Sequence, residues 1–263
     1  MARFFGRLGI AALLLLVVGI YLTQSGMWKD FSDASGIGNP DAQLGAPTVP
    51  RPGAGKGVVP NPFELGFDAL RGAGVDPDGF YGDALATLEK VPILAAGTGK
   101  YDEAKFGKVS TDKNGCTTFE QVLIRDLTDA VVTEDDPCHP VSGTLIDPYT
   151  GEAVEYVPGG TDVEVVYVVS PENAWASGAK KWGPKKRNQF YNDPANLVAV
   201  KADTAPPAMA TPDTWTPENA DMKCVYVSVW TQAKHRWNLS MTPQEAEAVD
   251  GTLRDCMGVG ASE

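Results

Sequence analysis

The chain has 263 residues, enough for one domain with a sizeable hydrophobic core and additional segments. Its hydrophobic content of 43% is ordinary for a globular protein. The net charge of −12 argues against broad electrostatic affinity for nucleic acid, although active nucleases can also be acidic overall.

The N-terminal segment has the pattern of an export signal. Arg3 and Arg7 precede an apolar run over residues 8–22, and no acidic residue occurs before Asp30. This pattern is typical of a signal peptide or a short signal anchor. Because bulky residues follow the run where a cleavage site would lie, we favour an anchor at residues 1–28. We therefore expect the protein outside the cytoplasm, either anchored to the membrane through residues 8–22 or secreted.

Two further segments precede the main domain. Residues 29–62 are rich in Gly, Pro, Ala and Asp, which predicts a flexible linker. Residues 63–100 carry apolar side chains at helical spacing around Phe67 and Leu85, which predicts short lead-in helices.

Three patterns of regular structure follow in the middle of the chain. The apolar residues of segment 117–132 lie on one side of a predicted helix. Segment 145–156 predicts a hairpin around the turn Asp147-Pro148-Tyr149-Thr150-Gly151. Two valine-rich runs, 163–169 and 197–200, predict a pair of strands separated by a long polar insertion.

The C-terminal end predicts two helices. Thr216-Pro217 is expected to begin the first, because apolar residues follow it at helical spacing. Thr242-Pro243-Gln244-Glu245 has the form of a capping box with proline at the first helical position, and is expected to begin the second.

The chain contains four cysteines, at positions 116, 138, 224 and 256. An even number in an exported chain implies disulfides, and four cysteines allow three pairings. We favour the two local ones, Cys116–Cys138 and Cys224–Cys256. A zinc site is the alternative, but the sequence has no C-x-x-C spacing that would support it.

The polar insertion carries a basic cluster on an otherwise acidic protein. Its members are Lys180, Lys181, Lys185, Lys186 and Arg187, grouped around Trp182. Basic residues beside an aromatic ring suit contact with nucleic-acid phosphates. The alternative is the solvated face of a helix that begins at Pro184.

Several sequence words together resemble the HNH endonuclease family typified by the C-terminal domain of the GmrSD modification-dependent restriction enzymes. The resemblance spans residues 101–253. The matching words are Arg125-Asp126-Leu127, Asp147-Pro148-Tyr149-Thr150-Gly151, Asn173-Ala174-Trp175, Ser177-Gly178-Ala179, Trp182, Arg187, Phe190, Asn192-Asp193-Pro194, Asn196-Leu197 and Cys224-x-Tyr226-Val227. The resemblance implies an α+β fold with an HNH (ββα-metal-type) hairpin core and surrounding helices, stabilised by disulfides, over residues 101–256 with a tail at 257–263. It also implies hydrolysis of DNA phosphodiesters with a divalent cation such as Mg²⁺.

The chain departs from this family where the chemistry is expected. The family's first strand ends in Asp-His, where this chain has Val166-Tyr167, and its later Asn-containing word is replaced around Ala205. Only Asn196 is retained, and Phe119 stands where the family usually has an arginine. In an HNH site the His deprotonates water, and the Asp and the distal Asn or His hold the metal. Valine and alanine offer no ligand, and a phenol with a pKa near 10 is a poor base at neutral pH.

We therefore expect a catalytically degenerate nuclease-like scaffold with no metal or cofactor, whose partners are nucleic acid or another envelope protein. One alternative is an active divalent-metal-dependent DNA endonuclease that uses replacement ligands, for which the candidates are Asp162, Glu164, Glu172 and Asp203. A second alternative is an envelope protein–protein interaction module. In either non-catalytic case Asn196 is expected to end the turn at residues 192–196 through side-chain hydrogen bonding, or to hold the hairpin loop in shape.

Overall fold

The computed structural model describes residues 60–259. The export segment predicted at residues 1–28 and most of the predicted linker therefore lie outside the described residues. Within residues 60–259, no helix is both long and apolar enough to cross a lipid bilayer. The end of the predicted linker is already part of the fold, because the Asn61 side chain donates a hydrogen bond to Asp126 over 2.8 Å.

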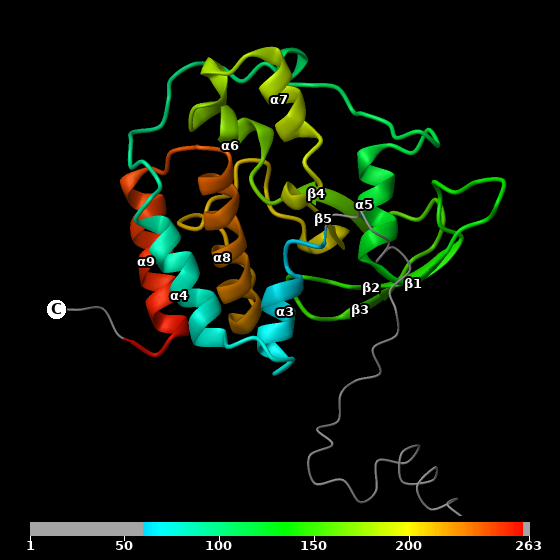
Figure 1. The fold of residues 1–263 in the computed structure, drawn as a ribbon, viewed down its shortest axis with the longest axis horizontal. Helices are drawn as coiled ribbons and strands as arrows, with labels where there is room; N and C mark the ends of the chain where they lie inside the picture. Colours follow the sequence, from blue (N-terminus) through cyan, green and yellow to red (C-terminus); the bar gives the residue numbers. More distant parts are fainter. Residues whose placement is uncertain (1–59, 260–263) are drawn as a thin grey trace, which may run out of the picture. The chain divides into compact units, whose positions relative to one another are not determined.

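Helices form one side of the structure. Helices α4 (Pro77–Leu88), α8 (Ala220–Arg236) and α9 (Pro243–Cys256) pack side by side, and α3 (Glu64–Leu70) packs against α4 and α8 (Figure 1). The main hydrophobic core lies among them and includes the fully buried rings of Phe63 and Trp230. Helices α3 and α4 lie within residues 63–100, where short helices are predicted, and they share their core with the C-terminal helices.

The starts of the two C-terminal helices show one confirmed and one wrong prediction. Thr242 and Glu245 form the predicted capping box, with Pro243 at the first position of α9. Helix α8 begins at Ala220 and not at Thr216, because the Asn219 side chain accepts hydrogen bonds from the backbone N–H groups of Asp221 and Met222 and caps the helix there.

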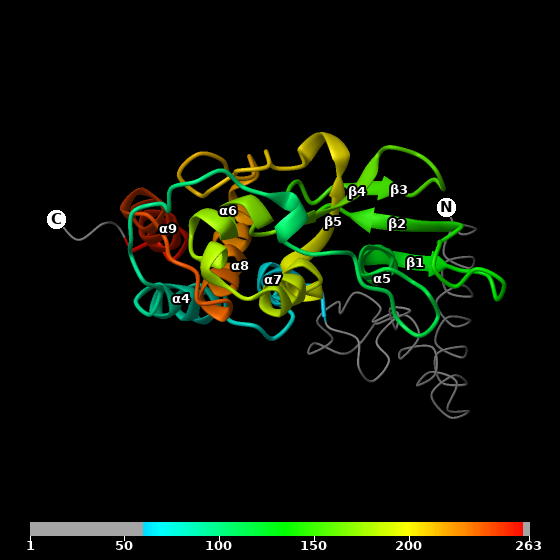
Figure 2. The same cartoon turned by 90° about the horizontal axis from the view of Figure 1, so that it is seen from above.

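Strands form two antiparallel sheets on the other side of the structure (Figure 2). The first has the order β1 (Leu127–Val131), β2 (Ser142–Ile146), β3 (Ala153–Glu155). The second is the predicted hairpin of β4 (Val163–Tyr167) and β5 (Leu197–Lys201), in which Val166 lies opposite Val198. Both views place this hairpin between the helices and the first sheet.

The helix predicted over residues 117–132 is only half correct. A capping box starts α5 (Thr118–Asp126), but the chain then continues as β1. Arg125 and Asp126 end the helix because their side chains bind the backbone of β5 and the segment before it. Leu127, fully buried and opposite Leu145, then packs into a small second core.

The predicted turn at residues 147–151 connects β2 to β3 and also supports β5. Asp147 is fully buried, and its Oδ2 accepts from the backbone N–H of Thr150 over 2.9 Å. Its Oδ1 accepts from the backbone N–H of Lys201 over 2.9 Å. The carboxylate thereby fixes the end of β5 relative to the first sheet.

The insertion between β4 and β5 is helical. It contains α6 (Pro171–Ala176), η2 (Ala179–Lys181), α7 (Pro184–Tyr191) and η3 (Pro194–Asn196), and short η1 (Glu103–Lys105) and η4 (Ala202–Thr204) turns occur elsewhere. Helix α7 starts at Pro184 as predicted.

Two disulfides brace this α+β fold. Cys116–Cys138 joins the segment before α5 to the loop between β1 and β2, and Cys224–Cys256 joins the start of α8 to the end of α9. Both predicted pairings are confirmed, as is the α+β class.

Candidate functional site

The retained asparagine closes the β4–β5 hairpin at the end where the insertion connects the two strands. The Asn196 side chain is fully buried, its Oδ1 accepts from the backbone N–H of Val169 over 3.0 Å, and its Nδ2 donates to the carbonyl of Val169 over 2.9 Å. The Asn196 carbonyl accepts from the N–H of Val168 over 2.9 Å. The side chain thus acts as a clamp that extends the strand pairing by two residues.

Tyr167 stands at the end of β4, where the resemblance places the catalytic histidine. Its hydroxyl donates to the backbone carbonyl of Tyr191 over 3.0 Å. Burial, followed by the proximity of Tyr191, raises the pKa of the Tyr167 phenol far above its ordinary value of 10.0. The phenol therefore stays protonated at neutral pH, and its proton is committed to a carbonyl, so it cannot deprotonate a water molecule.

Two residues that differ from the HNH family pattern, Phe119 and Tyr167, contact each other in the structure. The rings of Phe119 and Tyr167 contact each other edge to face, with centroids 5.8 Å apart. The Tyr191 ring contacts both, at 6.3 Å from Phe119 and 5.6 Å from Tyr167. We call Phe119, Tyr167 and Tyr191 the aromatic cluster. Such ring contacts stabilise by about 0.5–1.5 kcal/mol each beyond area burial.

The other substituted positions are also apolar and packed. Val166 and Ala205 are partly buried and pack against the main core. The candidate replacement ligand Asp203 is exposed and pairs with Lys201 over 3.1 Å. Within residues 60–259, no three His, Cys, Asp or Glu residues group as metal ligands would. The side chains at the HNH positions therefore do not fit a divalent cation, which prefers carboxylate and imidazole donors.

Two members of the predicted basic cluster are used by the fold. The Arg187 guanidinium donates to the carbonyl of Lys105 over 2.7 Å and to the carbonyl of Trp182. The Lys186 ammonium donates to the carbonyl of Trp237 over 3.2 Å and lies 4.2 Å from the centroid of the Trp182 ring. Their charges hold the insertion against its neighbours.

The other three basic residues are exposed in the middle of the insertion, in η2 and at the start of α7. Lys180 donates to the carbonyl of Thr98 over 3.0 Å. The side chains of Lys181 and Lys185 make no hydrogen bond or ion pair with another described residue. The structure thus divides the cluster, of which only Lys180, Lys181 and Lys185 are exposed to solvent.

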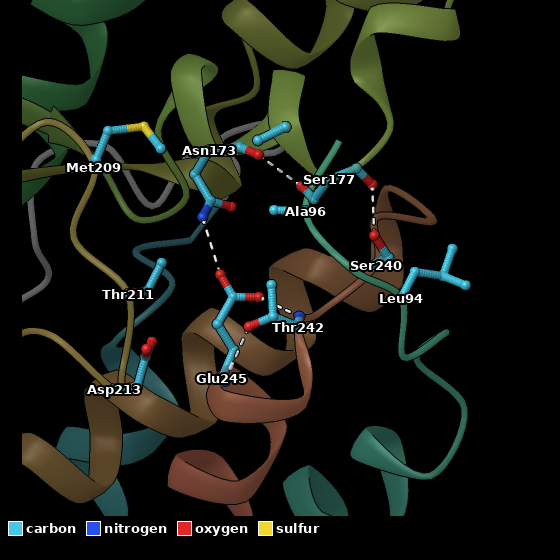
Figure 3. A pocket seen from close by; sticks show the side chains of 11 residues that line it. Leu94, Ala96, Asn173, Ser177, Met209, Thr211, Asp213, Ser240, Thr242 and Glu245 are labelled. Carbon is cyan, nitrogen blue, oxygen red and sulfur yellow. Dashed lines mark hydrogen bonds between the residues drawn. The ribbon is translucent and has the colours of Figure 1, made fainter. Parts of the chain in front are cut away.

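A pocket that the sequence did not reveal lies beside the start of α9 (Figure 3). Its volume is about 200 Å³, and segments 94–96, 173–177, 209–213 and 240–245 form it. The sequence signals for these segments, a capping box and an Asn-Ala-Trp word, describe local structure. They cannot show that four distant segments converge.

A buried polar network forms the inner wall of the pocket. Asn173 is only 4% exposed, and its Nδ2 donates to Glu245 Oε1 over 3.2 Å. Glu245 Oε2 accepts from the backbone N–H of Thr242 over 2.7 Å and lies 3.9 Å from the Lys234 ammonium. Lys234 is fully buried and donates to the carbonyl of Ser240 over 3.0 Å. Burial lowers the pKa of Lys234 to about 8, and the Glu245 carboxylate limits that decrease.

Comparison with known proteins gives one informative relative. No protein-family model matches the chain, and no solved structure matches it. A protein of Arthroderma benhamiae, described as an uncharacterized secreted protein, is 34% identical over 160 residues, which are 59% of this chain and 76% of the relative.

The fold and its two bridges define a disulfide-stabilised α+β protein. The chain belongs to the family of this Arthroderma secreted protein. The relative supports an extracellular location, whereas the HNH resemblance stays a prediction.

Proposed function

We propose that this protein is an exported HNH-type domain that has lost its nuclease chemistry and acts as a binding scaffold outside the cytoplasm. The observation that carries the proposal is the aromatic cluster. The residue at the position of the catalytic base packs against a second substituted residue, Phe119, and bonds a backbone carbonyl.

This arrangement favours replacement of the site by core packing over a simple loss of one ligand. A lone substitution would leave a polar cavity with unpaired groups, which costs free energy. Here the Tyr167 side chain occupies the position of the base and its hydroxyl is hydrogen-bonded, and both polar atoms of the Asn196 amide bond the backbone of Val169. Base and ligands are therefore replaced by groups that stabilise the hairpin.

Binding to a nucleic acid is the first activity to test, since Lys180, Lys181 and Lys185 are exposed on an acidic protein. The membrane anchor predicted at residues 8–22 would hold this scaffold at the cell surface, and cleavage after it would release the scaffold.

The test of lost catalysis is plasmid nicking by the purified full-length chain with Mg²⁺, with Mn²⁺ and with EDTA. We expect no metal-dependent cleavage. EDTA-sensitive cleavage would refute the proposal. The matched variant combines Val166→Asp, Tyr167→His and Ala205→Asn, and cleavage gained by it would show that the scaffold retains the HNH geometry.

The binding arm uses a separate variant. Lys180→Ala, Lys181→Ala and Lys185→Ala together should weaken salt-sensitive DNA binding, because each neutralised phosphate contact lowers the salt slope by about one. The control removes three exposed lysines outside the insertion, Lys90, Lys100 and Lys113. Equal losses in both variants would show a diffuse charge effect and not a binding site.

A further inference from the structure

The pocket beside α9 contains a buried acceptor without a partner. Asn173 Oδ1 makes no hydrogen bond within the described structure, although the rest of the side chain is fixed. Figure 3 shows this oxygen directed toward the interior of the pocket, on the side facing Ala96. An unpaired buried acceptor costs about 1–3 kcal/mol, so a native structure that keeps one calls for an explanation.

The orientation of the Asn173 amide is determined by its neighbour. Glu245 presents a carboxylate oxygen, which can only accept when ionised, so the amide nitrogen must face it. A flipped amide would bring two oxygens together. The free atom is therefore the oxygen, and a ligand must bring an N–H or O–H donor to it.

The charge of the pocket selects among donors. Glu245 lies at the inner wall, Asp213 is an exposed lining residue, and none of the described residues that line the pocket is basic. The Lys234 ammonium does not line the pocket; it donates to the Ser240 carbonyl, faces the Trp230 ring 4.6 Å from its centroid, and lies 3.9 Å from Glu245 Oε2. Because the Lys234 ammonium balances part of the Glu245 charge, the negative charge at the pocket comes mainly from Asp213, and this carboxylate together with the unpaired carbonyl oxygen favours a cation over an anion.

Most of the remaining lining surface is apolar, although Ser177, Thr211, Ser240 and Thr242 also line the pocket. Leu94, Ala96, Ala176 and Met209 contribute aliphatic surface to a volume of about 200 Å³. A dry cavity of about 150 Å³ holds a benzene molecule, so this space suits a chain of roughly four or five carbons. The lining therefore matches an apolar stem that ends in a positively charged donor.

We propose that this pocket binds an aliphatic ammonium group, with the ammonium at Asn173 Oδ1 and Glu245 and the alkyl stem against Leu94, Ala96 and Met209. The source is a lysine side chain of a partner protein or a free alkylamine, which share this chemistry. None of the substituted HNH positions lines the pocket, so the inference is independent of the nuclease proposal.

The test is a calorimetric and NMR titration of the full-length chain with n-butylammonium. We expect saturable binding, at least tenfold weaker binding of n-butanol, and no binding of butyrate. Equal binding of all three compounds would overturn the proposal, because the polar wall would then not distinguish an ammonium from an alcohol or a carboxylate. The absence of n-butylammonium binding at concentrations on the order of 10 mM would also overturn it.

Two variants tie the binding to the pocket. Ala96→Leu fills the pocket from an exposed loop and should abolish binding, whereas Ala95→Leu changes the neighbouring residue, which does not line the pocket, and should leave binding unchanged. Asp213→Asn keeps the shape and should weaken binding by about two- to fivefold. An unaltered affinity in Ala96→Leu would place the ligand elsewhere and refute the site.

A third comparison distinguishes the sources. N-acetyl-lysine methylamide represents a lysine of a protein partner, and 1,5-diaminopentane represents a free polyamine. Tighter binding of the first would assign the pocket to protein recognition, and tighter binding of the second to a small diamine. Failure of both to compete with n-butylammonium would contradict the proposed mode.

Discussion

A buried ion pair joins α5 to the central hairpin, and its removal should strongly destabilise the fold. Arg125 Nε donates to Asp126 Oδ1 over 2.7 Å, and Arg125 Nη2 donates to Asp126 Oδ2 over 2.9 Å. The side chains are only 6% and 1% exposed. The guanidinium also donates to the carbonyls of Pro194 and Leu197, over 2.7 and 2.8 Å.

The perturbation we consider is Arg125→Met, which keeps much of the apolar stem and removes all donors. It leaves the Asp126 carboxylate buried with the N–H of Ala199 and the Asn61 amide as donors, and it leaves two carbonyls without their partner. Breaking a buried pair in this way costs about 3–5 kcal/mol. Against a total stability of about 5–15 kcal/mol, that loss is large.

The assay is guanidinium unfolding with the disulfides intact, followed by tryptophan fluorescence. The control is Arg254→Met, since Arg254 Nε contacts Asp250 Oδ2 at the same distance of 2.7 Å but with side chains 34% and 41% exposed. We expect a far smaller effect from the control. Equal effects of the two variants would refute the argument that burial determines the cost. Arg125→Met combined with Asp126→Leu should recover part of the loss, because no unpaired charge remains.

Three further predictions concern stability. Replacing Cys224 and Cys256 by alanine removes a bridge between residues 32 positions apart and should lower the free energy of unfolding by about 3–4 kcal/mol. An unchanged denaturation midpoint would contradict this prediction. Asn196→Ala should cost about 2–3 kcal/mol in the same assay, because both buried backbone groups of Val169 lose their partner; a loss below 0.5 kcal/mol, on that principle's scale, would argue against the clamp. The pKa of Lys234 is lowered to about 8 in the folded chain from its ordinary value of 10.5, which applies to the unfolded chain. Between these two pH values the unfolded chain binds more protons than the folded chain, so the free energy of unfolding rises with pH. Unfolding from pH 7 to 10 should show that Lys234→Met lacks this rise of up to about 3 kcal/mol, and parallel profiles would refute the assignment.

Local patterns in the sequence predicted the features that depend on neighbouring residues. The capping box at Thr242, the proline start of α7 and the β4–β5 pairing follow from short-range chemistry and strand preference, and the structure confirms them. The disulfide pairings were also predictable, because both bridges join cysteines that are neighbours in the order of cysteines along the chain.

Long-range contacts determined the features that the sequence did not predict. Helical spacing continues past Asp126, but the contacts of Arg125 and Asp126 with distant backbone end α5 there and let β1 pair with β2. The contact of Phe119 with Tyr167 joins residues 48 positions apart, which spacing alone cannot predict. The pocket is a stronger case, since four separate segments contribute to it.

The central claim is that the HNH positions hold packed side chains and no divalent cation. Titration of the full-length chain with Mn²⁺, followed by paramagnetic broadening of backbone amide signals, tests it most directly. We predict no saturable broadening centred on Val166, Tyr167 and Ala205. Stoichiometric loss of these amide signals, reversed by EDTA, would contradict the account and would show that the hairpin still holds a metal.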